Sequence, residues 1–236
     1  LKGPRATPRT EQLIRRFDLK RDGTAALLAN LRTEIENDPE PEKLYSFAEL
    51  AYIQATRASA LGRKSQALDL YAAAVAHAYW YLFDPQYDRF RNPYDPQFRG
   101  ACELYNSSLE HAMRIVNKAS PIRPGAVYTI ETNQQQFRVA VSARGPCHEE
   151  DFERLAFVSD YEMEGLTNRH QTHGLGVPLI VVRRSHEDES DVEAYYPPGL
   201  SFAATAFLRV LPPAAYGQGN PGDVHCLLEL HDPVAI

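Results

Sequence analysis

Two histidines, His170 and His173, stand three residues apart just before a Gly-Leu-Gly turn and are candidate metal ligands. A zinc site needs three or four ligands, and the metalloprotease helix spaces its histidines four apart with a Glu between them. Here the spacing is three, no Glu intervenes, and glycines follow where a helix would continue. We therefore expect no metal ion and no cofactor. The two histidines belong either to a structural loop or to a contact with a ligand or partner.

The two glycines of the turn, Gly174 and Gly176, could hold a phosphate only if they closed a strand and opened a helix. They stand in the reverse order, because the run that follows them, at 177–182, is apolar at nearly every position. Such a run is typical of a strand that is buried on both faces. The glycines are then explained by backbone turns with positive φ and by close packing.

A catalytic serine would need the G-x-S-x-G elbow, in which a strand enters and a helix leaves. The nearest match is at 199–203, around Ser201, but the residues that follow it read as a strand. The acidic run at 185–193 lacks the ligand order of an EF-hand and is typical of a solvated surface loop. We therefore expect no catalytic residue in this chain.

A second group of candidate binding residues stands in the segment 92–106. Asp95 is a good helix N-cap with Pro96 at the first helical position, and Arg99 follows one turn later. Polar loop residues beside a rigid helix often contact a ligand, although capping alone explains Asp95. The candidate binding residues are therefore Asp95, Arg99, His170 and His173.

The elements that position these residues change in character along the chain. Helical periodicity predicts helices over 10–18, 24–37, 44–61, 64–83 and 96–118. Gly62 suits a left-handed cap between the third and fourth of these helices. The spacing of Ala55, Gly62, Ala67, Tyr71 and Ala74 resembles one tetratricopeptide (TPR) unit. A solenoid needs about three copies, so we predict one TPR-like hairpin within a helical bundle.

After a Pro/Gly joint at 120–125 the apolar residues alternate with period two. Strands are predicted at 127–131, 137–141, 156–161, 177–183, 204–210 and 224–230, with a short acidic helix at 148–154. Helices followed by strands indicate an α+β fold with a mostly antiparallel sheet of five or six strands. The predicted regions are 1–120 and 121–236, which fold either separately or as one continuous domain.

Composition excludes several classes of function. The net charge is −6 and no Lys/Arg stripe is present, so a nucleic-acid partner is not expected. The three cysteines are widely spaced and form no CxxC pair. No apolar run is long enough for a transmembrane segment. The N-terminal residues hold no hydrophobic signal core, and a first residue of Leu suggests a trimmed chain.

Four strings carry a resemblance that spans most of the chain: NPYDPQFRGACELYN (92–106), FVSDYE (157–162), THGLGVPLIVVR (172–183) and YYPPGLSFAATAFLRVL (195–211). They resemble the N-terminal region of large bacterial α/β-hydrolase-fold proteins, lipase- or esterase-like and exported to the periplasm or envelope. In that family the nucleophile elbow and triad lie in a hydrolase domain that follows. No catalytic residue is therefore carried over to a position in this sequence.

The resemblance implies an accessory region without a nucleophile of its own, which packs on or gates the downstream hydrolase domain of the same chain. An exposed apolar patch would be its signature. The alternative is a TPR-like module that binds another protein and has no attached enzyme. An enzyme in its own right would need a cluster of converging polar groups, and the sequence shows no such constellation.

Overall fold

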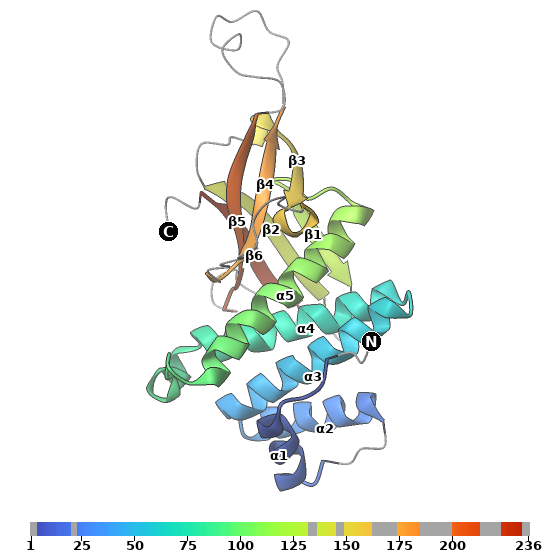
Figure 1. The fold of residues 1–236 in the computed structure, drawn as a ribbon, viewed down its shortest axis with the longest axis vertical. Coiled ribbons are helices and arrows are strands. Elements are labelled where there is room, and N and C mark those ends of the chain that lie inside the picture. Colours follow the sequence, from blue (N-terminus) through green and yellow to red (C-terminus); the bar gives the residue numbers. More distant parts are fainter. Residues whose placement is uncertain are drawn as a thin grey trace, which may run out of the picture. The chain divides into compact units, whose positions relative to one another are not determined.

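The computed structural model describes residues 4–19, 23–131, 136–144, 149–161, 174–184, 200–212 and 223–232. The fold is α+β, as predicted. The chain divides into two compact units, Leu1–Ile115 and Val116–Ile236, and the boundary falls inside the last helix (Figure 1).

The helical unit contains α1 (Pro8–Arg16), α2 (Thr24–Asn37), α3 (Pro41–Ala60), α4 (Lys64–Phe83), the 3₁₀ helix η1 (Pro85–Phe90) and most of α5 (Pro96–Ala119). The predicted bounds of α2 and α4 are confirmed. Helices α1 and α3 begin two to three residues earlier than predicted, because a proline occupies the first helical position of each. Helix α1 also ends earlier, before Asp18, whose φ is +44°.

Helices α3 and α4 pack against each other as a hairpin, and the turn between them is closed at Gly62. Gly62 has a φ of +74°, its N–H donates to the Ser59 carbonyl at 2.9 Å, and the Arg63 N–H donates to the Ala58 carbonyl at 2.9 Å. These are the two bonds of a Schellman cap, so the predicted left-handed cap is confirmed. The facing surfaces carry small, fully buried residues: Ala48, Ala51, Ala55, Ala67, Ala74 and Ala78.

The sheet unit contains β1 (Val127–Glu131), β2 (Gln136–Arg144), β3 (Phe152–Phe157), β4 (Val177–Arg183), β5 (Ser201–Val210) and β6 (Asp223–His231). Their order in the sheet is β1-β2-β6-β5-β4-β3. Every neighbouring pair is antiparallel except β2 and β6, which are parallel. The prediction of a mostly antiparallel sheet of five or six strands is confirmed.

The predicted acidic helix at 148–154 and the strand at 156–161 were wrong in position. Only Glu149–Asp151 form a short 3₁₀ turn, and β3 runs from Phe152 to Phe157 before a second turn at Val158–Asp160. Pairing with β4 overrides local propensity here, because it places Leu155 and Phe157 on the buried face, opposite Val181 and Leu179. A register shift between Phe152 and Arg154 permits that pairing.

The two faces of the sheet differ in burial. Strand β4 illustrates this, because Val177, Leu179 and Val181 are buried whereas Pro178 is exposed. The prediction that β4 is buried on both faces was therefore wrong at Pro178. Val182, which lies on the same face of the strand as Pro178, is buried. On the less buried face, β2, β6 and β5 carry the charged residues Arg144, Glu229 and Arg209.

Candidate functional site

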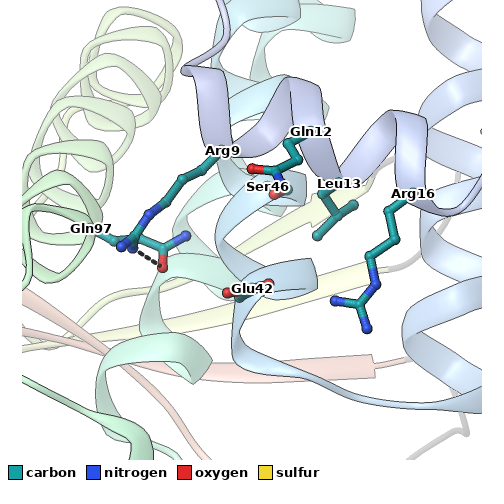
Figure 2. Close-up of a pocket in the computed structure, with 7 residues that line it drawn as sticks. All are labelled: Arg9, Gln12, Leu13, Arg16, Glu42, Ser46 and Gln97. Carbon is teal, nitrogen blue, oxygen red and sulfur yellow. Dashed lines mark hydrogen bonds between the residues drawn. The ribbon is translucent and has the colours of Figure 1, made fainter.

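A polar pocket of about 370 Å³ lies in the helical unit, between α1, the first turns of α3 and the first turn of α5 (Figure 2). Helix α1 turns Leu13 and Ile14 into the core of the unit. The polar residues Gln12 and Arg16 stand three and seven positions after Arg9. Residues at this spacing share one side of a helix, so all three lie on the flank of α1. The lining residues are Arg9, Gln12, Leu13, Arg16, Glu42, Ser46 and Gln97.

Helix α1 is fixed to α3 by two sets of hydrogen bonds. The Thr7 N–H donates to both carboxylate oxygens of Glu49, at 3.2 and 3.1 Å, and the Thr7 hydroxyl donates to Glu49 Oε2 at 3.0 Å. One turn later the buried Thr10 hydroxyl donates to Ser46 Oγ at 3.1 Å. Glu49 and Ser46 are themselves buried, so this wall of the pocket is rigid.

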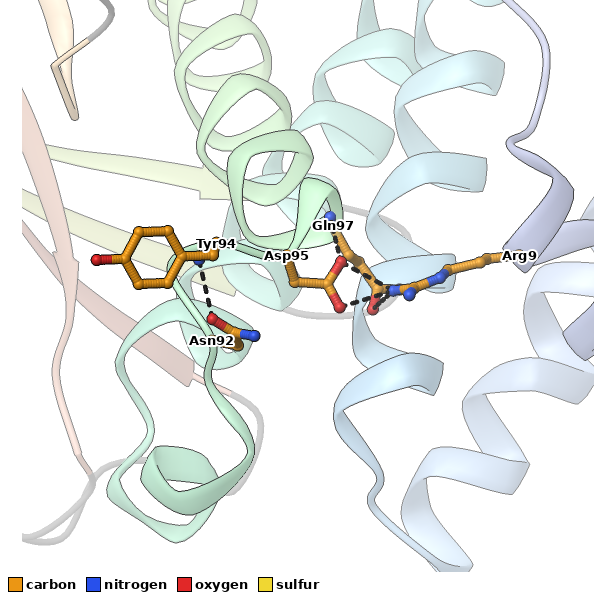
Figure 3. A network of polar contacts seen from close by, with 5 residues as sticks. All are labelled: Arg9, Asn92, Tyr94, Asp95 and Gln97. Carbon is orange, nitrogen blue, oxygen red and sulfur yellow. Dashed lines mark hydrogen bonds and ion pairs between the residues drawn. The ribbon is translucent and has the colours of Figure 1, made fainter.

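Asp95, one of the predicted binding residues, caps α5 and also contacts the pocket wall (Figure 3). Its Oδ1 accepts from the Gln97 N–H at 2.8 Å, which confirms the predicted cap. Arg9 Nη1 lies 3.0 Å from each carboxylate oxygen of Asp95. The cap hydrogen bond and then Arg9 hold the pKa of Asp95 below its ordinary value. Because both side chains are partly exposed, the ion pair is screened and positions Arg9 more than it stabilises the fold.

Gln97 connects this network to the pocket. Its side chain is only 8% exposed, and its Oε1 accepts from Arg9 Nη1 at 3.2 Å. Arginine is only a donor, so the oxygen must face Arg9 and the amide nitrogen must be the other atom. In the part of the chain that the structure describes, this Nε2 has no hydrogen-bond partner. The pocket wall thereby presents a solvent-accessible amide donor from a residue that is otherwise buried (Figure 2).

Two opposite charges line the same pocket without meeting. The Arg16 guanidinium lies over the Phe17 ring, 5.3 Å from its centroid. Neither Arg16 nor Glu42 forms an ion pair or hydrogen bond within the described residues. Both side chains are exposed to solvent. The pocket therefore offers a cation, an anion and an amide donor.

The other predicted binding residues do not join this site. Arg99 lies one turn further along α5, where its Nε is 3.1 Å from Glu103 Oε1, and its side chain is exposed outside the pocket. His170 and His173 lie outside the described residues. Sequence reasoning missed Arg9, Arg16, Glu42 and Gln97. The polar stripe Arg9-Gln12-Arg16 on α1 was a signal that could have indicated Arg9 and Arg16.

Other titratable groups of the described chain have structural roles. His77 is buried, its ring stacks on Phe47 with 4.0 Å between centroids, and its Nδ1–H donates to the Ala73 carbonyl at 2.8 Å. Burial lowers the pKa of His77 to about 4. Burial raises the pKa of the Cys226 thiol to about 12, so this group is not a thiolate nucleophile. Among the described residues, no three or more His, Cys, Asp or Glu side chains are grouped as metal ligands.

The sheet unit contains a buried ionic cluster around Glu229, whose side chain is 0% exposed. Arg209 Nε donates to Glu229 Oε2, Arg144 Nη2 lies 2.7 Å from Oε1, and His231 Nε2 lies 3.6 Å from Oε2. Arg144 forms an ion pair with Glu229 Oε1, but the geometry of this contact is not that of a hydrogen bond. Burial raises the pKa of Glu229, but Arg209, Arg144 and His231 together outweigh it and hold that pKa below its ordinary value.

No protein-family model matches the chain, and no curated protein or solved structure is significantly similar to it. None of the described helices is long and apolar enough to cross a lipid bilayer.

Proposed function

We propose that this chain is a non-catalytic accessory region of an α/β-hydrolase-like protein, which packs on the hydrolase domain or gates access to its active site. The observation that carries the proposal is a run of exposed aromatic side chains between the end of α4 and the start of α5. Phe83 is 37% exposed, Phe90 58% and Tyr94 94%. Large aromatic side chains that face solvent are typical of protein interfaces.

The backbone around these aromatic side chains is held in place. Arg91 Nε donates to the Tyr81 carbonyl at 3.1 Å, and its other nitrogens reach the Asp84 carbonyl and the Asp88 carboxylate. Asn92 Oδ1 accepts from the Tyr94 N–H at 3.0 Å, and Tyr94 points away from Arg9 (Figure 3). A surface that is already ordered loses little conformational entropy on docking.

The resemblance of the sequence supports the nature of the partner. The string 92–106 contains Tyr94 and the Asp95 cap, so one of the strings that resemble hydrolase proteins includes part of the exposed aromatic run. The same resemblance supports export to the periplasm or envelope. The aromatic run supports a docking surface, and the hydrolase partner comes from the resemblance.

The first test is to read the coding DNA beyond the codons for Leu1 and Ile236. We expect a downstream G-x-S-x-G motif between a strand and a helix, preceded upstream by an export signal. A stop codon directly after Ile236 would overturn the accessory role.

The second test uses the full-length protein, with p-nitrophenyl butyrate as the ester substrate. Phe90→Ala and Tyr94→Ala are expected to change KM or kcat several-fold, because they remove the docking surface without touching the core. Tyr161→Ala removes a comparably exposed aromatic of the sheet unit and serves as the control. Equal effects of all three substitutions would sink the docking role of the aromatic run.

The alternative function is a TPR-like protein-binding module with no attached enzyme. The α3–α4 hairpin favours it, because alanines line the contact between the helices and the fully buried Tyr71 fills the space beside Ala55 and Ala67. A stop codon after Ile236, together with specific binding of a defined peptide by the purified chain, would support this alternative over the hydrolase one.

A further inference from the structure

The pocket between α1, α3 and the start of α5 presents separated opposite charges, and this arrangement limits what can bind there. Arg9 lines the pocket but is already paired with Asp95. Among the described residues, the two lining charges that form no close ion pair are Arg16, which is positive, and Glu42, which is negative and interacts with Arg9 only at longer range. A ligand with no net charge but with both a carboxylate and an ammonium group matches this pair.

Ligands with only one charge match the pocket less well. An inorganic anion that reached Arg16 would also meet the Glu42 carboxylate, and a simple cation at Glu42 would meet Arg16. In either case one favourable interaction is offset by one of like charge. The mixed lining therefore discriminates against ions of a single sign.

The remaining lining groups indicate a ligand with a peptide bond. The Gln97 Nε2 donor suits a carbonyl oxygen, and it comes from a side chain that is already ordered by Arg9. Gln12 adds a second amide and Leu13 adds an apolar surface. At about 370 Å³ the pocket lies at the small end of the usual range for small-molecule sites, about 300–1,000 Å³.

We infer that this pocket binds a short zwitterionic peptide of about two residues, with its carboxylate at Arg16, its ammonium group at Glu42 and its peptide carbonyl at Gln97. Arg16 and Glu42 do not reach each other, so charges separated by a peptide bond fit better than the adjacent charges of one amino acid. This site goes beyond the proposed accessory role and does not depend on it.

The test measures binding of alanyl-alanine to the purified chain by calorimetry and ligand-observed NMR. Two probes remove one charge each: N-acetyl-alanyl-alanine has no ammonium group, and alanyl-alanine amide has no carboxylate. We expect each to bind about 10- to 100-fold more weakly than alanyl-alanine, which corresponds to the loss of one charge-assisted hydrogen bond. Free alanine is also expected to bind more weakly.

Two substitutions then assign each charge of the ligand to its side chain. Arg16→Gln should abolish the preference for the free carboxylate and retain the preference for the free ammonium group, and Glu42→Gln should do the reverse. Arg15→Gln is the matched control, because Arg15 neighbours Arg16 but pairs with Glu11 at 3.6 Å and does not line the pocket. Arg16 and Glu42 are exposed, so both variants should unfold at the wild-type temperature.

Several results would overturn the inference. These are no binding of alanyl-alanine at millimolar concentration, equal binding of the three dipeptide probes, or an equal loss of binding in the Arg15→Gln and Arg16→Gln variants. The comparison of probes on the unmodified chain tests the inference even if a variant fails to fold.

Discussion

At the scale of single residues, burial decides which titratable groups of this protein remain uncharged. His77 is the clearest example, because its ring lies between Phe47 and Trp80 and its one described hydrogen bond is made by the neutral ring to the Ala73 carbonyl. Its pKa is lowered from 6.5 to about 4 in the folded chain. The folded chain therefore binds a proton at His77 less readily than the unfolded chain does.

The stability of the protein should consequently fall as the pH drops from 6.5 toward 4. The unfolded chain binds a proton at His77 in this window and the folded chain does not, so the unfolded state gains stability. The expected loss is about 3 kcal/mol of the free energy of unfolding at the lower limit. Urea denaturation at several pH values measures it, with the emission of Trp80 as the signal.

The control for this prediction is His77→Phe, which keeps an aromatic ring beside Phe47 and removes the titration. We expect a flatter pH dependence between 6.5 and 4 in this variant. An unchanged slope would show that other groups cause the effect.

The sequence predicted part of the site at this scale. The Asp-Pro pair identified Asp95 as a cap, because capping depends on neighbours along the chain. It could not identify Arg9 as the partner of Asp95, since the two are brought together by the packing of α1 and α5. Glu42 and Gln97 were missed for the same reason.

At the scale of elements, glycines fix the entry to β4. Gly176 has a φ of +113°, and a Cβ there would lie 2.6 Å from Thr205 Cγ2 and 2.8 Å from the Ala206 carbonyl oxygen. Both of those atoms belong to the middle of β5. At Gly176 the turn before β4 is therefore a packing feature as well as a backbone turn, as the sequence predicted, whereas Gly174 has neither a positive φ nor an atom within 4 Å of an added Cβ.

Substitution of the two glycines of this turn should have unequal effects. Gly176→Ala is expected to cost about 2–4 kcal/mol of the free energy of unfolding, from an unfavourable φ and from overpacking. Gly174→Ala is the control and should change it by less than about 0.5 kcal/mol, because nothing lies within 4 Å of its added Cβ. Equal effects in thermal or urea unfolding would contradict this explanation.

The cluster around Glu229 joins three neighbouring strands, because Arg144, Glu229 and Arg209 come from β2, β6 and β5. Glu229→Gln should cost about 1–3 kcal/mol at neutral pH, since it removes hydrogen bonding to a charged group. The pKa of Glu229 is lowered on folding, so its contribution is complete above pH 4.5 and is lost as the pH falls through the folded value. The variant should lack that acid dependence.

Hydrogen exchange of the β2, β5 and β6 amides, measured from pH 7 to pH 3, checks this prediction. The matched control is Glu153→Gln on β3, an exposed carboxylate 4.0 Å from Arg154, which should have little effect. Equal protection in wild type and Glu229→Gln at every pH would contradict the role of the cluster.

Periodicity and caps were sufficient for most elements but not for their pairing. The bounds of α2, α4, β1 and β4 follow from glycine, proline and alternation in the sequence. Alternation gives the face of a strand but not its neighbour or direction. The parallel pairing of β2 with β6 was therefore not predictable. The acidic residues at 148–154 led to the prediction of a helix where the chain forms a short 3₁₀ turn and the start of β3.

At the scale of the whole molecule, each unit carries core residues of its own. The helical unit buries Leu13, Leu31 and Phe47 in one cluster and Ala55, Ala67 and Tyr71 in a second. The single tryptophan, Trp80, lies in α4 of this unit. Its emission can therefore be compared with sheet signals from the same sample.

A chain that ends at Pro212, and so lacks β6, is expected to lose the sheet and to keep the helices. Strands β2 and β5 would both lose the neighbour that lies between them. Cooperative unfolding by Trp80 emission should persist, while circular dichroism loses its strand contribution. A chain that ends at Asp232 is the control and should behave like the wild type. Loss of the Trp80 transition in the shorter chain would show that the helices depend on the sheet.

The central position of β6 also has a consequence for biosynthesis. Strand β6, the last of the described strands to be synthesised, must enter between β2 and β5, which were made earlier. At a translation rate of about 5–20 residues per second, β2 waits several seconds for its parallel partner. During this interval the helical unit has time to fold, whereas the exposed edges of β2 and β5 are vulnerable to aggregation. A chaperone that binds nascent strands would therefore act on the sheet unit rather than on the helices.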